Sequence, residues 1–501
     1  MKIKNVELVS LFEQAFSNGP AKDIDEIGTV VQVGDGSCKV HGLLNVVYGE
    51  LVDFDGGNKG IVLDIDQELV SIFLLYNDVV VVENEVARRT NTVFKVPVGN
   101  KLLGRVINAL GKPLDALGDI QATEMMPIES EIASIIERSP VNESLETGVL
   151  VVDGLIPIGK GQRELLIGNR NTGKTALAID AILHQKGKNV ICIYVAIGQR
   201  QANIARLVNL LEKEGALDYT VIVNADAGQA VLNQYLAPYV GTTIGEYFRA
   251  QGQDVLIVYD DLSNHAVAFR EMSLLLRRPP GREAYPGDVF YLHSRLLERS
   301  GKLTNGGSLT ALPIIQIQSD DITAYVPTNL ISITDGQLFF DTKLFNNGIR
   351  PAVNVELSVS RVGGAAQTKA IKKVARSLRL ELAQYHDLLA FSQFGTDLDE
   401  ASQRQLARGA LIVELLKQPQ FVTYSFVDQA LMLFLLQNNF LDDIKKEKVR
   451  DFVVKFASYV LSIHGPLYQN ILKTLDISSS IQEELKQIAQ EFKKMFFQPN
   501  S

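Results

Sequence analysis

The sequence predicts a multidomain α/β protein with three parts: a small N-terminal β-barrel in residues 1–85, a parallel-sheet domain in 86–364 and a helical bundle in 365–501. Three observations support this division. Short apolar runs between glycine turns come first, β-branched runs alternating with helical stretches follow, and purely helical periodicity comes last. The chain has 501 residues, 46% of them hydrophobic, which is enough for several cores.

Composition excludes several classes of function. The net charge of −9 and the pI of 5.4 disfavour nucleic acid as a partner. Cys38 and Cys192 are the two cysteines. They form no metal-binding spacing, so a reducing, cytosolic compartment fits best. Residues 1–20 lack the apolar core of a signal peptide, and no apolar run reaches the length of a spanning helix. If the protein works at a membrane, another component must hold it there.

The first part reads as a series of short strands. Apolar runs at 27–33, 49–54, 60–65 and 69–74 are separated by glycine-containing turns. Short strands at this spacing are typical of a small barrel. No chemistry is evident in it, so a structural or oligomer-forming collar is the simplest interpretation.

The central part alternates strands and helices. Runs at 189–195, 220–223 and 254–259 are rich in β-branched residues and lack polar alternation. Such runs indicate a parallel sheet covered on both faces. Ligands of these sheets bind beyond the carboxyl ends of the strands.

A phosphate-binding motif follows one of these strands. Residues 168–175 read G-x-x-x-x-G-K-T, between the apolar run 165–167 and the helix-prone run 176–179. Strand, glycine loop and helix are the context that a nucleotide loop needs, and a glycine turn with a surface lysine is the alternative. Lys174 is expected to reach the terminal phosphates and Thr175 to bind Mg²⁺. The nucleotide-binding residues are predicted to be Gly168, Asn169, Arg170, Asn171, Thr172, Gly173, Lys174 and Thr175.

Two further positions bear on hydrolysis. Asp260 directly follows the run 254–259 and is predicted to hold Mg²⁺, whereas Asp261 could instead cap the next helix. Gln199 follows the strand that ends near Val195. A carboxylate there could accept a proton from attacking water, but an amide cannot, although glutamine orients water in some GTPases. These residues predict a site that binds nucleotide and hydrolyses it poorly.

The last part becomes helical. Residues 370–380, 405–413 and 481–497 carry apolar side chains at spacings of three and four. A helical bundle is therefore predicted. The acidic turn 396–400 reads by default as a solvated loop.

Over essentially its whole length the sequence resembles the alpha subunits of F-type rotary ATP synthases. Gln199 favours alpha over beta, because catalytic beta subunits carry their essential glutamate at the matching place. The remaining motifs that carry the resemblance are 158–165, 259–263, 276–290, the signature 351–360 and the alpha-like stretch 360–367.

The resemblance implies a central domain of the RecA-like P-loop NTPase type that binds ATP or ADP with Mg²⁺ without turning it over. In the family, alpha and beta subunits alternate in a hexamer around a gamma shaft, and delta and stator-stalk subunits hold the ring. The complex is an H⁺-transporting two-sector ATPase that makes ATP from ADP and phosphate with a proton or sodium gradient. The isolated chain is then non-catalytic and, in a bacterium, peripheral at the cytoplasmic face of the cell membrane.

Two residues with a part in catalysis are implied by the same resemblance. Arg361 matches the family's arginine finger, which reaches into the beta catalytic site. Ser358 matches a serine that family members need for full activity. A guanidinium fork spreads charge over the transferring phosphoryl oxygens. Without the resemblance, Arg361 could simply pair with a surface carboxylate.

Other family features map onto the two ends of the chain. Residues 397–399 match the place where the C-terminal domain faces the shaft, and 6–12 match a stator contact, with a floppy terminus as the alternative. Asn169 and Asn171 replace the usual Asp and Gln, and 132–140 also differs, so atypical affinity or a specialised F-type-like assembly is possible.

Three functions stay open from sequence alone. The first is a nucleotide-binding subunit that completes a partner's active site. The second is a homohexameric motor ATPase, against which Gln199 counts. The third is a structural ring component with a vestigial loop, against which Lys174, Thr175 and Asp260 count.

Overall fold

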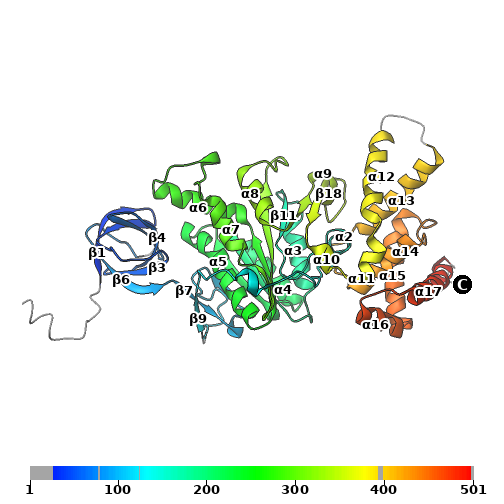
Figure 1. The fold of residues 1–501 in the computed structure, drawn as a ribbon, viewed down its shortest axis with the longest axis horizontal. Helices are drawn as coiled ribbons and strands as arrows, with labels where there is room; N and C mark the ends of the chain where they lie inside the picture. Colours follow the sequence, from blue (N-terminus) through cyan, green and yellow to red (C-terminus); the bar gives the residue numbers. More distant parts are fainter. Residues whose placement is uncertain (1–25, 77–78, 123, 393–398, 498–501) are drawn as a thin grey trace, which may run out of the picture. The chain divides into compact units, whose positions relative to one another are not determined.

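A computed structural model describes residues 26–76, 79–122, 124–392 and 399–497. The chain divides into two compact units that meet between Phe94 and Lys95. The β-barrel, the parallel-sheet domain and the C-terminal helices expected from the sequence are all confirmed (Figure 1).

The first unit is a closed six-stranded barrel in the order β1-β2-β5-β4-β3-β6. Alternate side chains point inward, as Val30, Val40 and Val52 show by their complete burial. The boundary expected at residue 85 falls before β6, which pairs with β1 and β3 and closes the barrel. The strands are β1 (Ile27–Gly34), β2 (Ser37–His41), β3 (Glu50–Phe54), β4 (Lys59–Ile65), β5 (Leu69–Leu74) and β6 (Val86–Val93).

The second unit is built on a sheet whose central strands are almost completely buried. Its order is β18-β17-β11-β16-β14-β12-β13-β8, parallel throughout except that β18 runs antiparallel to β17. The strands are β8 (Val106–Asn108), β11 (Glu164–Asn169), β12 (Val190–Gln199), β13 (Thr220–Asp226), β14 (Asp254–Asp260), β16 (Ser308–Ile317), β17 (Gly336–Phe340) and β18 (Val353–Ser360). The short strands are β7 (Lys95–Val98), β9 (Glu124–Pro127), β10 (Arg138–Ser139) and β15 (Gly301–Leu303).

Helices cover both faces of this sheet. The chain moves in one direction through α3 and α4 and turns back through α5, α6 and α8, so right-handed crossovers place the two sets on opposite faces. Figure 1 shows both layers. The helices are α2 (Leu150–Leu155), α3 (Lys174–Leu183), α4 (Gln201–Lys213), α5 (Val231–Ala250), α6 (Leu262–Leu275), α7 (Val289–Leu297), α8 (Tyr325–Ile333) and α9 (Thr342–Asn346).

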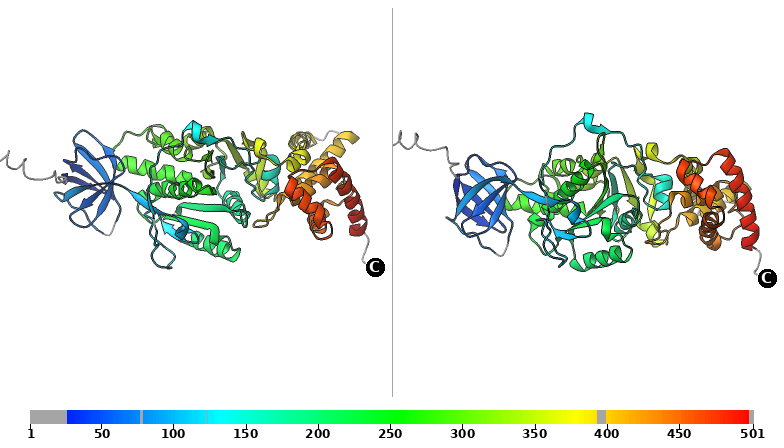
Figure 2. Two further views of the ribbon diagram at one scale, coloured as in Figure 1. Left: turned by 60° about the horizontal axis from the view of Figure 1, so that its bottom comes forward. Right: turned by 90° about the horizontal axis from the view of Figure 1, so that it is seen from below.

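The C-terminal part of the second unit is a helical bundle (Figure 2). Nearly every side chain of α14 is buried, and Phe434, Phe452 and Phe456 are among the largest buried groups. Within the described ranges, no helix is both long and apolar enough to cross a membrane. The helices are α10 (Gly363–Ala366), α11 (Lys369–Ala375), α12 (Leu378–Ser392), α13 (Glu400–Leu416), α14 (Phe426–Gln437), α15 (Val449–Ile463), α16 (Gly465–Thr474) and α17 (Ser479–Phe497).

Candidate functional site

The glycine loop lies where the sequence predicts it, between the end of β11 and the start of α3. A Cβ atom on Gly168 would lie 2.5 Å from the carbonyl oxygen of Phe340, so only glycine fits beside β17. Gly173 has φ of +103°, a left-handed conformation that L side chains rarely adopt. The loop therefore turns tightly and leads directly into the N-terminus of α3, where backbone N–H groups favour an anion.

Lys174 is held inside this loop. Its side chain is 5% exposed, and Nζ donates to the carbonyl oxygens of Gly168 at 2.8 Å and Asn169 at 2.5 Å. Burial lowers the pKa of the Lys174 ammonium to about 8, against the opposing attraction of Asp261 and Asp260. The ammonium is thus positioned by neutral acceptors and available to a stronger, anionic one.

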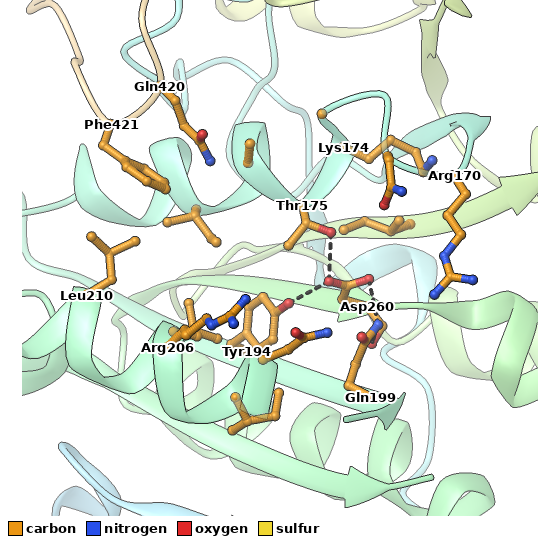
Figure 3. Close-up of a pocket in the computed structure, with 18 of the residues that line it drawn as sticks. Arg170, Lys174, Thr175, Tyr194, Gln199, Arg206, Leu210, Asp260, Gln420 and Phe421 are labelled. Atoms are coloured by element: carbon orange, nitrogen blue, oxygen red, sulfur yellow. Dashed lines mark hydrogen bonds between the residues drawn. The ribbon is translucent and has the colours of Figure 1, made fainter. Parts of the chain in front are cut away.

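Asp260 lies at the centre of a small polar cluster at the end of β14. Its Oδ2 accepts hydrogen bonds from Thr175 Oγ1 at 2.9 Å and from the Tyr194 hydroxyl at 2.5 Å (Figure 3). Burial raises the pKa of the Asp260 carboxyl, which is 3% exposed. A hydroxyl and a carboxylate are the oxygen ligands that Mg²⁺ prefers, so these residues fit the predicted metal position.

Gln199 borders the same carboxyl. Its Nε2 donates to Asp260 Oδ1 at 3.3 Å, and the amide lines the cavity beside the glycine loop. Asp261 fills the capping role considered for it, because its carboxylate accepts from the backbone N–H of Asn264 at 2.8 Å at the start of α6. Asp261 also accepts from Gln316 Nε2 at 2.6 Å, and it therefore serves the fold.

The loop opens onto a cavity of about 650 Å³. In Figure 3, Arg170 approaches it from the side opposite Gln420 and Phe421. Arg170, Lys174 and Arg206 give the cavity cationic groups, and Asp260 adds a carboxyl. A cavity of this size and charge suits a polyanion such as the phosphates of a nucleotide. The same cavity is also lined by Asn171, Gly173, Thr175, Tyr194 and Gln199.

A second cavity, of about 480 Å³, adjoins the loop on its other side. Thr172, Gly173 and Ala176 line it together with an apolar wall and several amides. Aromatic and proline faces beside amides suit a planar heterocycle. These residues come from segments far apart in sequence, and sequence reasoning missed them because no local motif marks them. They are Phe345, Arg350, Pro351, Gln418, Pro419 and Gln420.

The loop at 417–424, between α13 and α14, is tied to the phosphate side of the site. Asp180 on α3 accepts a hydrogen bond from the backbone N–H of Phe421 at 2.7 Å. Gln418 accepts from the N–H of Leu150 at 3.0 Å and donates to the carbonyl oxygen of Gly148 at 2.8 Å. The helix that begins at Lys174 and the bundle are therefore joined directly at the cavity wall.

The two unusual asparagines have different surroundings. Asn169 donates to Thr342 Oγ1 at 2.9 Å and accepts from the N–H of Asp320 at 3.1 Å, so it braces the loop from outside the larger cavity. Asn171 lines that cavity and has φ of +63°. Asparagine tolerates this left-handed conformation better than most residues, so the substitution suits the turn.

Arg361 and Ser358 lie elsewhere, at the β18 edge of the sheet, and neither lines the cavities beside Lys174. Ser358 Oγ donates to the carbonyl oxygen of Asn354 at 2.6 Å and accepts from the N–H of Phe339 at 2.9 Å, so its hydroxyl bridges β17 and β18. Arg361 is exposed, and its Nη2 lies 3.4 Å from the carbonyl oxygen of Ile331. A catalytic role for either residue needs a second chain.

Two expectations fall on residues whose structure is not described here. The stator contact at 6–12 and the shaft-facing residues Asp397 and Leu398 lie outside the described ranges. Asp399 is described, and its carboxylate caps α13 by accepting from the N–H of Ser402 at 3.0 Å. The acidic turn therefore has at least one structural role.

Comparison with known proteins agrees with this architecture domain by domain. Residues 23–91 match the β-barrel domain of the ATP synthase alpha/beta family, 148–360 its nucleotide-binding domain and 367–492 its C-terminal domain. ATP synthase subunit alpha of Caldanaerobacter subterraneus subsp. tengcongensis is 51% identical over 99% of both chains. ATP synthase subunit alpha of Clostridium botulinum is 52% identical over 99% of this chain and 100% of its own. The chain belongs to the ATP synthase alpha/beta family.

Proposed function

We propose that the chain is the alpha-type, nucleotide-binding and largely non-catalytic subunit of an F-type ATP synthase. Its full-length relatives bear that name, and its three domains match the family in order. The proposal depends on one observation: the phosphate and magnesium residues of this chain lie apart from the arginine that hydrolysis also needs. Lys174 and Asp260 line the chain's own nucleotide cavity, whereas Arg361 lies at another edge of the sheet.

The phosphates of ATP or ADP are expected to bind to the loop formed by residues 168–175. The backbone N–H groups at the start of α3 and the Lys174 ammonium favour their negative charge. Thr175 and Asp260 would hold Mg²⁺, which neutralises phosphate charge when it is bound. The base is expected in the adjoining cavity, which Phe345, Gln418 and Gln420 line.

Turnover at this chain's own site is expected to be slow. Gln199 lies beside Asp260 and lines the phosphate cavity, and its amide cannot take a proton from water. This counts against a homohexameric motor ATPase. The intact loop and magnesium residues count against a purely structural ring component.

The partners that this function implies are beta subunits alternating with this chain, a gamma shaft and delta or stator-stalk subunits. Nucleic acid is not among them. The ring would lie at the cytoplasmic face of the cell membrane and couple indirectly to the ion-translocating sector, with protons or sodium ions as the coupling ion. A specialised F-type-like assembly is the alternative that the departures at Asn169 and Asn171 suggest.

The test compares ATP turnover of the purified chain with turnover of the ring that it forms with its beta-type partner. Arg361→Ala is expected to lower turnover of the ring by about 10³–10⁵-fold while nucleotide still binds to this chain. Arg361→Lys is the matched variant and should recover little, because a point charge cannot replace the planar fork. Appreciable turnover by the chain alone, or full turnover of the Arg361→Ala ring, would reject the proposal.

A further inference from the structure

The turn that carries Arg361 is held by the residues directly before β11. Arg361 directly follows β18, and residues 360–363 connect that strand to α10. β11 begins at Glu164 and ends in the glycine loop. The same strand thus has the phosphate site at one end and the support of Arg361 at the other.

Gln162 makes the central contacts on one side of this turn. Its side chain is completely buried, and Nε2 donates to Ser360 Oγ at 3.0 Å and to Glu164 Oε2 at 2.7 Å. Its Oε1 accepts from the backbone N–H of Gly159 at 2.8 Å. Both ends of the amide are therefore used, and the side chain cannot rotate without breaking bonds that burial makes costly to lose.

Ser360 passes this support to the backbone. Its hydroxyl donates to the carbonyl oxygen of Pro157 at 2.6 Å and accepts from the N–H of Gly363 at 3.2 Å. A Cβ atom on Gly363 would lie 1.7 Å from the same Pro157 oxygen, so the turn packs directly onto that segment. Ser360 is the residue before Arg361, so its contacts hold the backbone from which the Arg361 side chain extends.

The other side of the turn is fixed by an ion pair. The backbone N–H of Arg361 donates to the carbonyl oxygen of Asp335 at 2.9 Å. Asp335 in turn accepts from Arg163 Nε at 3.0 Å and Nη2 at 2.9 Å, in a bidentate arrangement. Consecutive residues of one segment, Gln162 and Arg163, thus hold the turn on both sides.

We propose that Gln162 is a positioning residue for Arg361, acting through Ser360 to aim the guanidinium at the neighbouring subunit's nucleotide. The inference rests on the proposed role of Arg361. The backbone of the turn is fixed at Ser360 and at Asp335, whereas the guanidinium itself is exposed. A side chain that acts on another chain must be exposed, and the backbone that carries it must be held in a fixed position.

The carboxyl of Glu164 supports the same arrangement. Burial raises its pKa well above the usual range, against the hydrogen bond from Gln162 and the attraction of Arg361. Its Oε1 has no hydrogen-bond partner in the described part of the chain. Gln162 is the group that anchors this carboxyl, through Oε2.

The experiment is a double-mutant cycle on the reconstituted ring, with Gln162→Met and Arg361→Ala singly and together. Methionine keeps the length of the side chain and removes the amide. Gln162→Met is expected to lower kcat by about 10–100-fold, because small misplacements of a catalytic group have effects of this size. KM at the partner's sites and nucleotide binding to this chain should stay within about twofold, since the interaction is made in the transition state.

The decisive result is the behaviour of the double variant. If Gln162 acts through Arg361, adding Gln162→Met to Arg361→Ala should cause no further loss. Residual rates are followed over hours, so that a further tenfold fall stays measurable. An equal loss in both backgrounds, or no loss in either, would overturn the inference. Full turnover of the Arg361→Ala ring would instead overturn the proposed function, so the two failures are distinguishable.

Two variants guard against a trivial cause. Gln185→Met removes another buried glutamine amide, one that donates to the carbonyl oxygens of Glu146 and Ala181 just beyond the C-terminal end of α3. Its turnover should match the unchanged ring. Ser360→Ala breaks the same link with a smaller change of volume and serves for the cycle if the Gln162→Met chain does not assemble.

Discussion

Lys174→Met is the variant that tests the nucleotide site most simply. Methionine keeps most of the length of the side chain and removes the charge. A hydrogen bond to a charged group contributes about 1.5–3 kcal/mol. In the structure, Nζ already has two carbonyl acceptors, at 2.8 and 2.5 Å, so only part of this free energy is gained when phosphate replaces them. A net loss of roughly 1.4–2 kcal/mol remains, and it corresponds to a rise in Kd of about 10–30-fold.

The assay is titration of the purified chain with a fluorescent ATP analogue and Mg²⁺. Lys213→Met is the matched control, because Lys213 is exposed at the end of α4 and does not line the cavity. Its Kd should equal that of the unchanged chain. Equal affinity of Lys174→Met and the unchanged chain would refute the placement of phosphate at the loop, and an equal loss in both variants would show a nonspecific charge effect.

Three further substitutions test buried titratable groups and a buried hydrogen bond. Burial raises the pKa of Asp180 to about 7, above its value in the unfolded chain. Protonation of Asp180 therefore stabilises the fold at low pH, and this stabilisation is lost as the pH rises through 7. The melting temperature of Asp180→Asn, relative to that of the unchanged chain, should therefore be higher at pH 8 than at pH 5. The same difference at both pH values would contradict this prediction. Burial lowers the pKa of His293, whose ring nitrogens lack partners within the described ranges, so stability falls as pH drops below about 6.5. In thermal melts, His293→Leu should be as stable as the unchanged chain at pH 7.5 and should lose less stability than that chain when the pH is lowered to 5. An equal loss of stability in both chains would refute the reasoning. Ser358→Ala should lower the free energy of unfolding by about 1–3 kcal/mol in denaturant titrations, because the N–H of Phe339 loses its acceptor; a loss under about 0.5 kcal/mol would contradict that account.

Local pattern was sufficient to predict the architecture and the place of the glycine loop within it. The G-x-x-x-x-G-K-T stretch lies on a loop between a strand and a helix, and Asp260 ends the strand predicted for it. Both signals are contiguous in sequence, and their geometry follows from the chain's local path. The contact between Thr175 and Asp260 follows from the sheet order, which places β11 and β14 on either side of β16.

The residues that line the second cavity could not be predicted from pattern. Phe345, Arg350 and Gln418 meet there because the bundle packs against the sheet domain, and no spacing in the sequence encodes that packing. The boundary expected at residue 85 left out the last strand of the barrel, β6. β6 is rich in polar residues, two of its side chains being Arg88 and Arg89, so it lacks the apolar run by which the other barrel strands were recognised.

The function of Ser358 shows a third limit. The resemblance implied a part in catalysis, whereas in the structure the Ser358 hydroxyl donates to Asn354 within β18 and accepts from Phe339 of β17. Ser358 lies three residues before Arg361 on the strand that carries it. Its importance for activity would then come through the position of that strand, which stays a prediction.

The central claim is that the chain binds a nucleotide yet supplies Arg361 to the reaction of its neighbour. A structure of the assembled ring with nucleotide at every site tests this most directly. The account predicts the Arg361 guanidinium at hydrogen-bond distance, about 3 Å, from a phosphate oxygen of the neighbour's nucleotide. A guanidinium that stays at the carbonyl oxygen of Ile331, away from any adjoining nucleotide, would contradict it.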